Sequence, residues 1–162
     1  MVIDSFAPAL PLLEIAPSDI GLGVFARAPI DAGQTICVLR GPLLNLRQVR
    51  AKGAAAGNVL QVGTNCYLDL EPPGRYLNHA CVPNAGLRDD TRLVALNQIS
   101  ANTEIRFDYS TTIGDGWTMP CACGAAGCRG NIAAFQCLPA NLRQRYLTLD
   151  IVQRFLWQEL GA

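Results

Sequence analysis

Four of the seven cysteines have the spacing and the side-chain chemistry of metal ligands. Three of them form a C-x-C-x4-C cluster and the fourth comes forty residues before it; they are Cys81, Cys121, Cys123 and Cys128. Four thiolates close a tetrahedral structural zinc site, although two disulfides would use the same residues. In a reducing compartment, clustered cysteines favour the metal, so we predict a structural Zn²⁺ at these four side chains. The isolated Cys37, Cys66 and Cys137 are predicted to be small buried hydrophobic residues.

Polar residues next to the first of these cysteines could bind a small molecule. The segment from Asn78 to Asn84 places Asn78 and His79 directly after an apolar run, where polar side chains rarely lie without a task. His79 is the only histidine, and it could instead be a zinc ligand or a core residue. One short segment is therefore predicted to join a metal site to a ligand pocket.

Composition restricts the class of protein. Half of the 162 residues are hydrophobic and 16% are charged, which indicates one folded domain rather than a disordered chain. The net charge is zero and the pI is about 6.5, so we expect no direct nucleic-acid partner. No apolar run reaches the roughly 18 residues that span a membrane, and the start lacks the basic region of a secretion signal. We expect a cytoplasmic protein with no membrane partner, and secretion into a host is left open.

Short strands are the dominant predicted elements. Residues 1–20 hold three prolines among apolar residues, and they predict an extended lead-in or an edge strand. Apolar, β-branched runs bounded by turn residues predict strands at 21–26, 35–39, 59–62, 66–70, 93–96 and 105–107. Two of these runs flank Gly63-Thr64-Asn65 and so predict a hairpin. A short helix is predicted over 46–56, with Gly53 and Gly57 as stops.

The chain ends in a predicted helix. Apolar residues recur at steps of three and four from Leu142 to Leu160, with Asn141 as the N-cap and Gly161 as the stop. The apolar face of this helix packs either on the chain's own core or in a homodimer. Before it, residues 111–130 are rich in Gly, Pro and Cys, which indicates a loop held by something other than a core.

Four motifs follow one another along the chain. They are Gly21-x-Gly23-x-Phe25-Ala26, Asn78-His79-x-Cys81-x-Pro83-Asn84, Glu104-Ile105-Arg106-Phe107-Asp108-Tyr109 and Cys121-x-Cys123-x4-Cys128-Arg129-Gly130. In this order they resemble the SET-domain protein lysine methyltransferases that carry a post-SET zinc loop. The short layout is most similar to minimal bacterial or viral members of that family.

The resemblance implies a mostly β SET-domain fold, in which several short sheets surround a pseudoknot and a helix closes the chain. In this fold residues 104–109 tuck under the loop of residues 78–84. The implied divisions are an N-terminal lead-in at 1–20, a SET domain at 21–110, a post-SET zinc loop at 111–137 and a C-terminal helix at 138–162.

The resemblance also implies a role for each motif. The family transfers methyl groups from S-adenosylmethionine to a lysine of a histone-like or other basic protein. Tyr109 matches the catalytic tyrosine. Phe107 matches a position that holds Tyr or Phe, and Phe there leaves room for di- or trimethylation. The positions that match donor-binding residues are Gly21, Leu22, Gly23, Arg75, Asn78 and His79.

Some features favour other functions. Leu39 stands where the family often has an aromatic residue, and the substrate region is short. Both favour the alternative of a catalytically silent, zinc-stabilised SET-like module that binds a peptide or a partner. A redox or metal sensor built on the cysteines is a third hypothesis, which leaves Tyr109 unexplained.

Two further expectations concern the substrate. Trp117 or Phe135 is expected to line the lysine channel. Acidic residues that could attract a basic peptide are Glu71, Asp89, Asp90 and Asp115.

Overall fold

The computed structural model describes residues 12–114 and 116–159. Expectations that fall on residues 1–11, on Asp115, and on Leu160 and Gly161 lie outside the described residues. Among the helices of the described part, none has the length and apolar character needed to cross a membrane.

Five small sheets account for the strands of the described residues. The antiparallel hairpin near the start pairs β1 (Leu13–Ser18) with β2 (Gly21–Ala26). Two three-stranded sheets have the orders β3 (Thr35–Val38), β9 (Arg92–Ala95), β8 (Ala85–Arg88) and β4 (Leu43–Leu44), β6 (Cys66–Asp69), β5 (Val59–Gly63). The remaining pairs are parallel β7 (Asn78–His79) with β10 (Arg106–Phe107) and antiparallel β11 (Thr118–Pro120) with β12 (Asn131–Ala133). The expectation of a mostly β fold built from several short sheets is confirmed.

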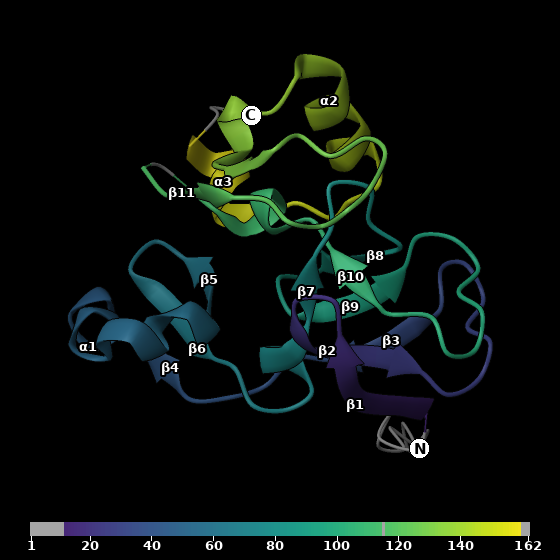
Figure 1. Ribbon diagram of the computed structural model, residues 1–162. Helices are drawn as coiled ribbons and strands as arrows, with labels where there is room; N and C mark the ends of the chain where they lie inside the picture. The colour runs from purple at the N-terminus through teal and green to yellow at the C-terminus, as the bar shows by residue number, and fades with distance from the viewer. Residues whose placement is uncertain (1–11, 115, 160–162) are drawn as a thin grey trace, which may run out of the picture.

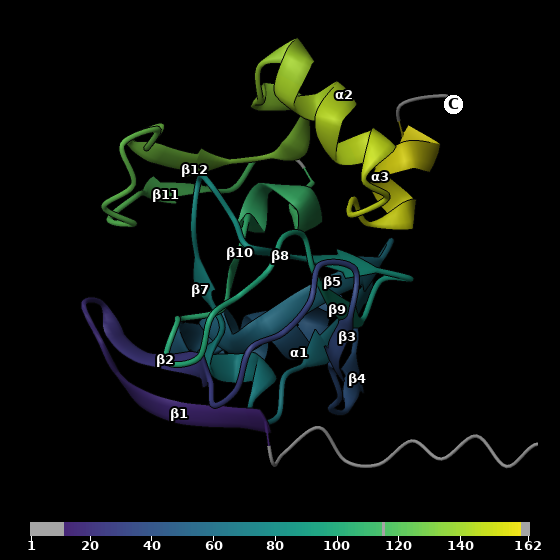
Figure 2. The same cartoon turned by 90° about the vertical axis from the view of Figure 1, so that its right-hand side faces the viewer.

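These elements form three parts around the centre of the molecule (Figures 1 and 2). The strands β4, β5 and β6 lie with the first helix, α1 (Leu46–Ala51), at one side of the molecule. The strands β1 to β3 and β7 to β10 lie at the other side. The β11–β12 hairpin and the last two helices, α2 (Ala140–Thr148) and α3 (Arg154–Glu159), cover the end above both.

Two hydrophobic clusters hold these parts together. The larger lies among the central strands, where Val24, Leu93 and Ile105 are fully buried. The smaller lies under α2 and α3. At Gly86 on β8, a Cβ would stand 2.7 Å from Cγ2 of Ile151. A glycine is therefore required where the C-terminal segment packs on the sheet.

The predicted helix over 46–56 is only half α-helix. Asn45 caps α1 by accepting from the Gln48 backbone N–H at 3.0 Å, while the Gln48 side chain accepts from the Asn45 N–H at 2.9 Å. The α-helix ends at Ala51, and the chain continues as a 3₁₀ helix, η2 (Gly53–Asn58). Gly53 has φ of +56°, a left-handed conformation that interrupts the α-helix.

The hairpin predicted around Gly63-Thr64-Asn65 is confirmed, because β5 and β6 pair there with Gly63 opposite Cys66. The loop predicted over 111–130 is partly wrong. It contains β11 and the end of a 3₁₀ helix, η4 (Tyr109–Thr112). Two further 3₁₀ helices within the described residues are η3 (Gly74–Tyr76) and η5 (Phe135–Cys137).

The single C-terminal helix predicted from sequence is wrong in detail, because the structure has two helices there. Asp150 takes φ of +55° after α2, and the N–H of Ile151 returns to the carbonyl of Tyr146 at 3.2 Å. With the bond from Asp150 N–H to Leu147 O at 3.0 Å, this is a Schellman ending. Pro139, not Asn141, stands at the N-cap.

The apolar side chains of the C-terminal segment pack within the chain itself. Tyr146, Phe155 and Leu156 are buried in the cluster under α2 and α3. The homodimer that could use the same segment stays a prediction.

Candidate functional site

The side chain of Asn84, in the loop 78–84, holds the segment 104–109 against this loop with two hydrogen bonds, called here the Asn84 clasp. The Asn84 amide donates to the carbonyl of Glu104 at 2.8 Å and accepts from the N–H of Arg106 at 2.9 Å. Parallel pairing of β7 with β10 continues this contact, and the Ala80 N–H reaches the Phe107 carbonyl at 3.1 Å. The clasp places the chemistry-bearing residues at the end of β10 next to those of β7.

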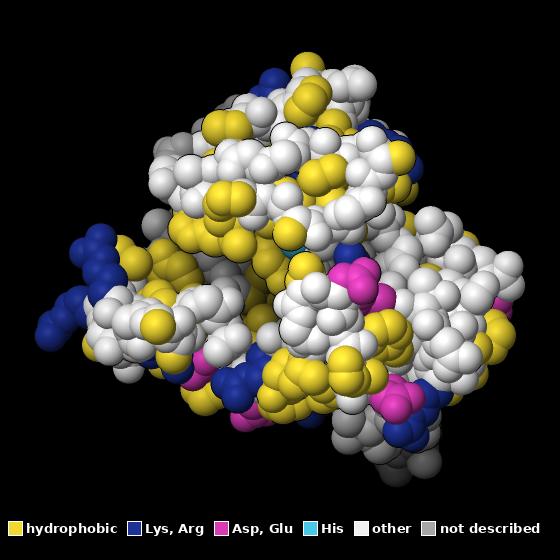
Figure 3. Space-filling model, in the orientation of Figure 1, with side chains coloured by type: hydrophobic (Ala, Val, Ile, Leu, Met, Phe, Trp, Pro, Cys, Tyr) yellow, Lys and Arg dark blue, Asp and Glu magenta, His cyan; other side chains and the backbone are white. Residues whose placement is uncertain are grey.

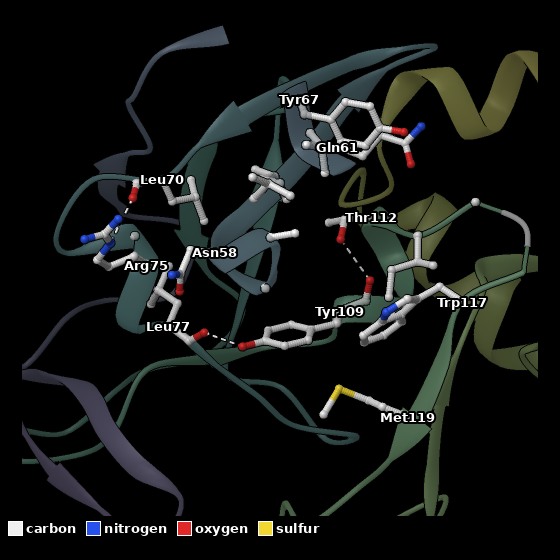
Figure 4. Close-up of a pocket in the computed structure, with 18 of the residues that line it drawn as sticks. Asn58, Gln61, Tyr67, Leu70, Arg75, Leu77, Tyr109, Thr112, Trp117 and Met119 are labelled. Carbon is white, nitrogen blue, oxygen red and sulfur yellow. Dashed lines mark hydrogen bonds between the residues drawn. The ribbon is translucent and has the colours of Figure 1, made fainter. Parts of the chain in front are cut away.

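Tyr109 follows β10 and is held at both ends. Its hydroxyl donates to the carbonyl of Leu77 at 2.6 Å (Figure 4). Its backbone N–H donates to Nδ1 of His79 at 3.1 Å. Its ring lies 4.9 Å from that of Phe107, centroid to centroid. Burial, with the charge of Glu104 adding to it, raises the pKa of Tyr109 to about 12. The phenol therefore stays protonated at neutral pH, and it acts as a hydrogen-bond donor rather than a base.

A cavity of about 800 Å³ opens beside Tyr109. Gln61 and Tyr67 lie on one wall, and Trp117 and Met119 lie on the other (Figure 4). In the space-filling view, hydrophobic side chains surround the hollow between the part that carries α1 and the part that carries β11 (Figure 3). Tyr109 thus lies at an apolar cavity of a size that suits a long side chain.

Sequence reasoning found part of this cavity. Trp117 lines it as expected, whereas Phe135 is 1% exposed and belongs to the cluster under α2 and α3. It missed Gln61 and Tyr67, which are direct cross-strand partners and so share one face of their sheet. The predicted hairpin contained the signal, because its register places these two side chains together. Met119 had no such signal, since β11 was expected to be loop.

The two glycines of the first motif serve different purposes. Gly21 has φ of +116°, and nothing lies within 4 Å of where its Cβ would stand, so the backbone offers an open face. At Gly23 a Cβ would overlap the carboxylate of Glu104 and stand 3.2 Å from Nδ2 of Asn78. Asn78 Nδ2 in turn donates to the Leu22 carbonyl at 2.9 Å and to Glu104 Oε1 at 2.7 Å. Asn78 and the turn are thereby fixed to each other, with the Gly21 side left free for a ligand.

Arg75 lies on the wall of the cavity that contains Tyr109. Its Nε donates to the carbonyl of Leu70 at 3.1 Å (Figure 4). A role of Arg75 in binding the donor carboxylate stays a prediction.

The cysteines of the two distant motifs come together. The Sγ atoms of Cys81 and Cys121 are 3.7 Å apart, and the thiols of Cys123 and Cys128 are near enough to change the pKa of Cys121. Thiolates at about 2.3 Å from a tetrahedral ion stand roughly 3.8 Å apart, whereas a disulfide needs about 2.05 Å. All the cysteines are free thiols. The donor set therefore fits a closed metal site and does not fit a pair of disulfides.

One thiol of this cluster is prepared for ionisation. Burial opposes ionisation of Cys123, but the backbone N–H groups of Cys81 and Ala125, together with the thiols of Cys121 and Cys128, outweigh it and lower the pKa of Cys123 to about 6. Burial raises the pKa of Cys121 to about 12. A metal ion binds thiolates rather than thiols. The positive charge of a bound ion would itself lower the pKa of Cys121, which the neighbouring groups do not lower.

The family model described as SET domain matches residues 21–110, more than half of the chain. The chain belongs to the SET-domain family. It is 28% identical over 127 residues to the Drosophila melanogaster histone-lysine N-methyltransferase SETD1, which is 68% of this chain and 8% of that protein. It is 31% identical over 128 residues to the Homo sapiens histone-lysine N-methyltransferase, H3 lysine-36 specific; the match covers 68% of this chain and 5% of that protein. It is 31% identical over 127 residues to the Yarrowia lipolytica histone-lysine N-methyltransferase, H3 lysine-4 specific; the match covers 67% of this chain and 11% of that protein. The chain thus spans a small fraction of the length of these relatives.

Within this SET domain, His79 is a hydrogen-bond donor to the cysteine cluster. Four ligand atoms lie within 4.8 Å of one another, and they belong to His79, Cys81, Cys121 and Cys123. Burial lowers the pKa of His79 to about 4, so its ring is neutral at pH 7. Its Nδ1 accepts from Tyr109, so the proton is on Nε2, which stands 3.3 Å from the Cys81 sulfur. A protonated Nε2 donates to that sulfur and cannot bind an ion. Cys128 lies outside this group of four, and its role as the fourth ligand stays a prediction.

An ion pair with a buried carboxylate joins the cysteine loop, which lies beyond the matched SET domain, to the segment that precedes Tyr109. Both terminal nitrogens of Arg129 donate to the carboxylate of Asp108, each at 2.8 Å. Tyr146 of α2 donates to the same carboxylate at 2.8 Å. Asp108 is 1% exposed and directly precedes Tyr109, while Arg129 directly follows Cys128 and its N–H reaches the Cys81 sulfur at 3.4 Å. The motifs contained Asp108 and Arg129, but nothing in the sequence paired them with Tyr146, 38 residues beyond Asp108.

Tyr146→Phe should lower the free energy of unfolding by about 1.5–3 kcal/mol, because it removes one hydrogen bond to a buried carboxylate. Asp108 keeps Arg129, so the fold should persist. Urea denaturation measures the change. The matched control is Tyr76→Phe, which removes a hydroxyl from a ring on the larger core cluster. Equal stability of Tyr146→Phe and the wild-type chain would contradict the role of Tyr146.

Proposed function

We propose that this chain is a protein-lysine N-methyltransferase that uses S-adenosylmethionine as its methyl donor. The observation that carries the proposal is the Tyr109 hydroxyl at an apolar cavity, beside the turn and the Asn78 contacts of a SET domain. The relatives are named as histone-lysine N-methyltransferases, which supports the same reaction.

The donor would bind at the turn of β2 and at β7. Gly21 has an open face there, and Leu22 and Gly23 are fixed by Asn78 and Glu104. The residues proposed to hold the donor are Gly21, Leu22, Gly23, Arg75, Asn78 and His79. S-adenosylmethionine supplies, when bound, a methyl group on a sulfonium.

The cavity and Tyr109 would prepare the lysine. A free lysine amine has a pKa of about 10.4, and an apolar cavity lowers it, so the neutral nucleophile becomes accessible. The Tyr109 hydroxyl donates its proton to a hydrogen bond with the Leu77 carbonyl at 2.6 Å. The lone pairs of the Tyr109 oxygen are therefore available to accept a hydrogen bond from the lysine amine. Tyr109 therefore orients the nitrogen.

A structural Zn²⁺ held by Cys81, Cys121, Cys123 and Cys128 would fix the far wall of the cavity. The cysteines of the loop come directly after β11, which carries Met119 into the cavity wall. The Cys81 ligand joins this loop to β7. Zinc would thereby keep the loop closed against the site.

Phe107→Tyr should shift the products toward monomethyl lysine, because a hydroxyl added beside Tyr109 takes the space that a methylated amine needs. Phe107 is 5% exposed, and its ring lies 4.9 Å from that of Tyr109. The wild-type chain is proposed to reach di- or trimethyl lysine. Mass spectrometry of a peptide product measures the distribution. Phe25→Tyr, on β2 and outside the cavity lining, is the control, and an unchanged distribution in Phe107→Tyr would contradict the assignment.

The alternative is a catalytically silent SET-like module that binds a peptide or a partner. Leu39 was the residue that favoured it, but Leu39 is 4% exposed in the core and lies outside the cavity lining. A leucine at this position, in place of an aromatic residue, therefore does not argue against catalysis. Titration calorimetry with S-adenosylmethionine separates the two functions. We expect one donor bound per chain, and absence of binding by the zinc-loaded protein would favour the silent module.

A further inference from the structure

The cavity beside Tyr109 is nearly free of charge. Among the described residues that line it, Arg75 is the single charged side chain, and it is positive. The polar side chains of Asn58, Gln61 and Tyr67, which also line the cavity, are neutral (Figure 4). The rest of the lining is largely aliphatic or aromatic, with Trp117 45% exposed at the surface.

Two of the four acidic residues that could attract a basic peptide are paired with arginine within the chain. Asp89 is bound by Arg92 at 2.5 Å and by Arg154 at 2.6 Å. Asp90 accepts from the backbone N–H of Arg154 at the start of α3. Glu71 is outside the cavity lining, and Asp115 is outside the described residues. The expectation of acidic attraction thus has no support among the described residues.

We propose that the substrate lysine of this enzyme is flanked by uncharged, apolar residues rather than by the arginines and lysines of a polybasic tail. The proposal rests on the lysine methyltransferase function proposed above. A flanking arginine in this cavity would lose hydration without gaining a carboxylate partner among the described lining residues. A flanking leucine or valine would instead bury apolar surface against residues such as Trp117 and Met119.

Two peptides of equal length test the proposal, each with one lysine as the only possible target. One has leucine, valine and alanine at the positions on either side, and the other has arginine at the same positions. With zinc-loaded protein and S-adenosylmethionine, kcat/KM should be at least about ten-fold higher for the apolar peptide, as expected for one or two partly buried aliphatic side chains. The ratio should persist when salt rises from about 50 to 300 mM.

Variants at the cavity wall test the cause of the preference. Trp117→Glu or Met119→Glu puts a carboxylate on the wall, and it should lower the ratio at least about five-fold, because a partner for arginine now exists. These side chains are 45% and 40% exposed, so the fold tolerates the change. Leu43→Glu is the matched control, because Leu43 is 65% exposed and outside the cavity lining; it should leave the ratio unchanged.

Each outcome decides between the possibilities. Equal kcat/KM for the two peptides, a preference for arginine flanks, or an unchanged ratio in both wall variants overturns the proposal and leaves the methyltransferase function standing. If neither peptide reacts but proteins of a lysate are methylated, the sequences around the labelled lysines test the proposal. Apolar flanking residues support the proposal, and flanking residues rich in arginine or lysine overturn it. If no protein is methylated, the proposed function fails, and this inference fails with it.

Discussion

Tyr109→Phe should reduce the rate of methyl transfer by roughly a hundred-fold or more, because the hydroxyl that orients the lysine nitrogen is lost. The phenylalanine ring keeps the contacts with Phe107 and His79. Only the oxygen that faces the amine and binds the Leu77 carbonyl disappears. The rate is measured as label transferred from S-adenosylmethionine to a lysine peptide under single-turnover conditions.

The Tyr109→Phe protein should still fold and should keep its zinc and its affinity for the donor. Its zinc content and its donor affinity should be unchanged, because the cysteine cluster and the turn at Gly21 do not contact the hydroxyl. Its stability should fall by about 1–3 kcal/mol, since the buried carbonyl of Leu77 loses its donor. Full activity in this variant would remove Tyr109 from the mechanism.

Cys81→Ser should weaken zinc binding by about a hundred-fold and lower methyl transfer with it. A structural zinc site is worth about 10–16 kcal/mol over four ligands, so one lost thiolate removes a substantial share. Cys81 is the ligand that joins the cysteine loop to β7, 3.7 Å from Cys121, and it also accepts from the Arg129 N–H. Metal content after dialysis against a chelator and kcat/KM on the same sample measure both effects.

Cys66→Ser is the matched control for the cysteine experiment. Cys66 begins β6, away from the cluster, and is partly exposed. It should retain both zinc and activity. If Cys81→Ser retained zinc and activity as Cys66→Ser does, the metal site would not include Cys81, and the loop would not depend on it.

Local patterns predicted β2, β3, β5, β6, β9 and β10 and part of the candidate site, but not the strands β4, β7, β8, β11 and β12. The hairpin at Gly63-Thr64-Asn65 and the strand at β2 follow from turn residues and alternation, which are properties of a few neighbouring residues. The order of the four motifs predicted the family. The meeting of Cys81 with Cys121, at 3.7 Å, followed from ligand chemistry.

Features that depend on tertiary packing were not predictable from the chain. Leu142 to Leu160 has the periodicity of one helix, yet the left-handed Asp150 divides it so that Ile151 can reach Gly86. Tyr146 has the position of a core residue in that pattern, but its hydroxyl binds Asp108. Local sequence did not distinguish Phe135 from Trp117 as a channel residue, and only the fold shows which one reaches the cavity.

The ligand role of His79 was decided by a hydrogen bond rather than by spacing. Its proximity to Cys81 in sequence allowed a metal ligand, a core residue or a donor-binding residue. The Tyr109 N–H bonds to Nδ1 and so directs the other ring nitrogen, with its proton, at the Cys81 sulfur. This bond also connects the metal cluster to the backbone of the proposed catalytic residue.

The most direct measurement of the central claim is the transfer of a labelled methyl group from S-adenosylmethionine to lysine in proteins of a cell lysate, followed by amino-acid analysis. The account predicts methylated lysine in the presence of the zinc-loaded wild-type chain and none above background with Tyr109→Phe. Donor binding without label in any lysine would contradict it.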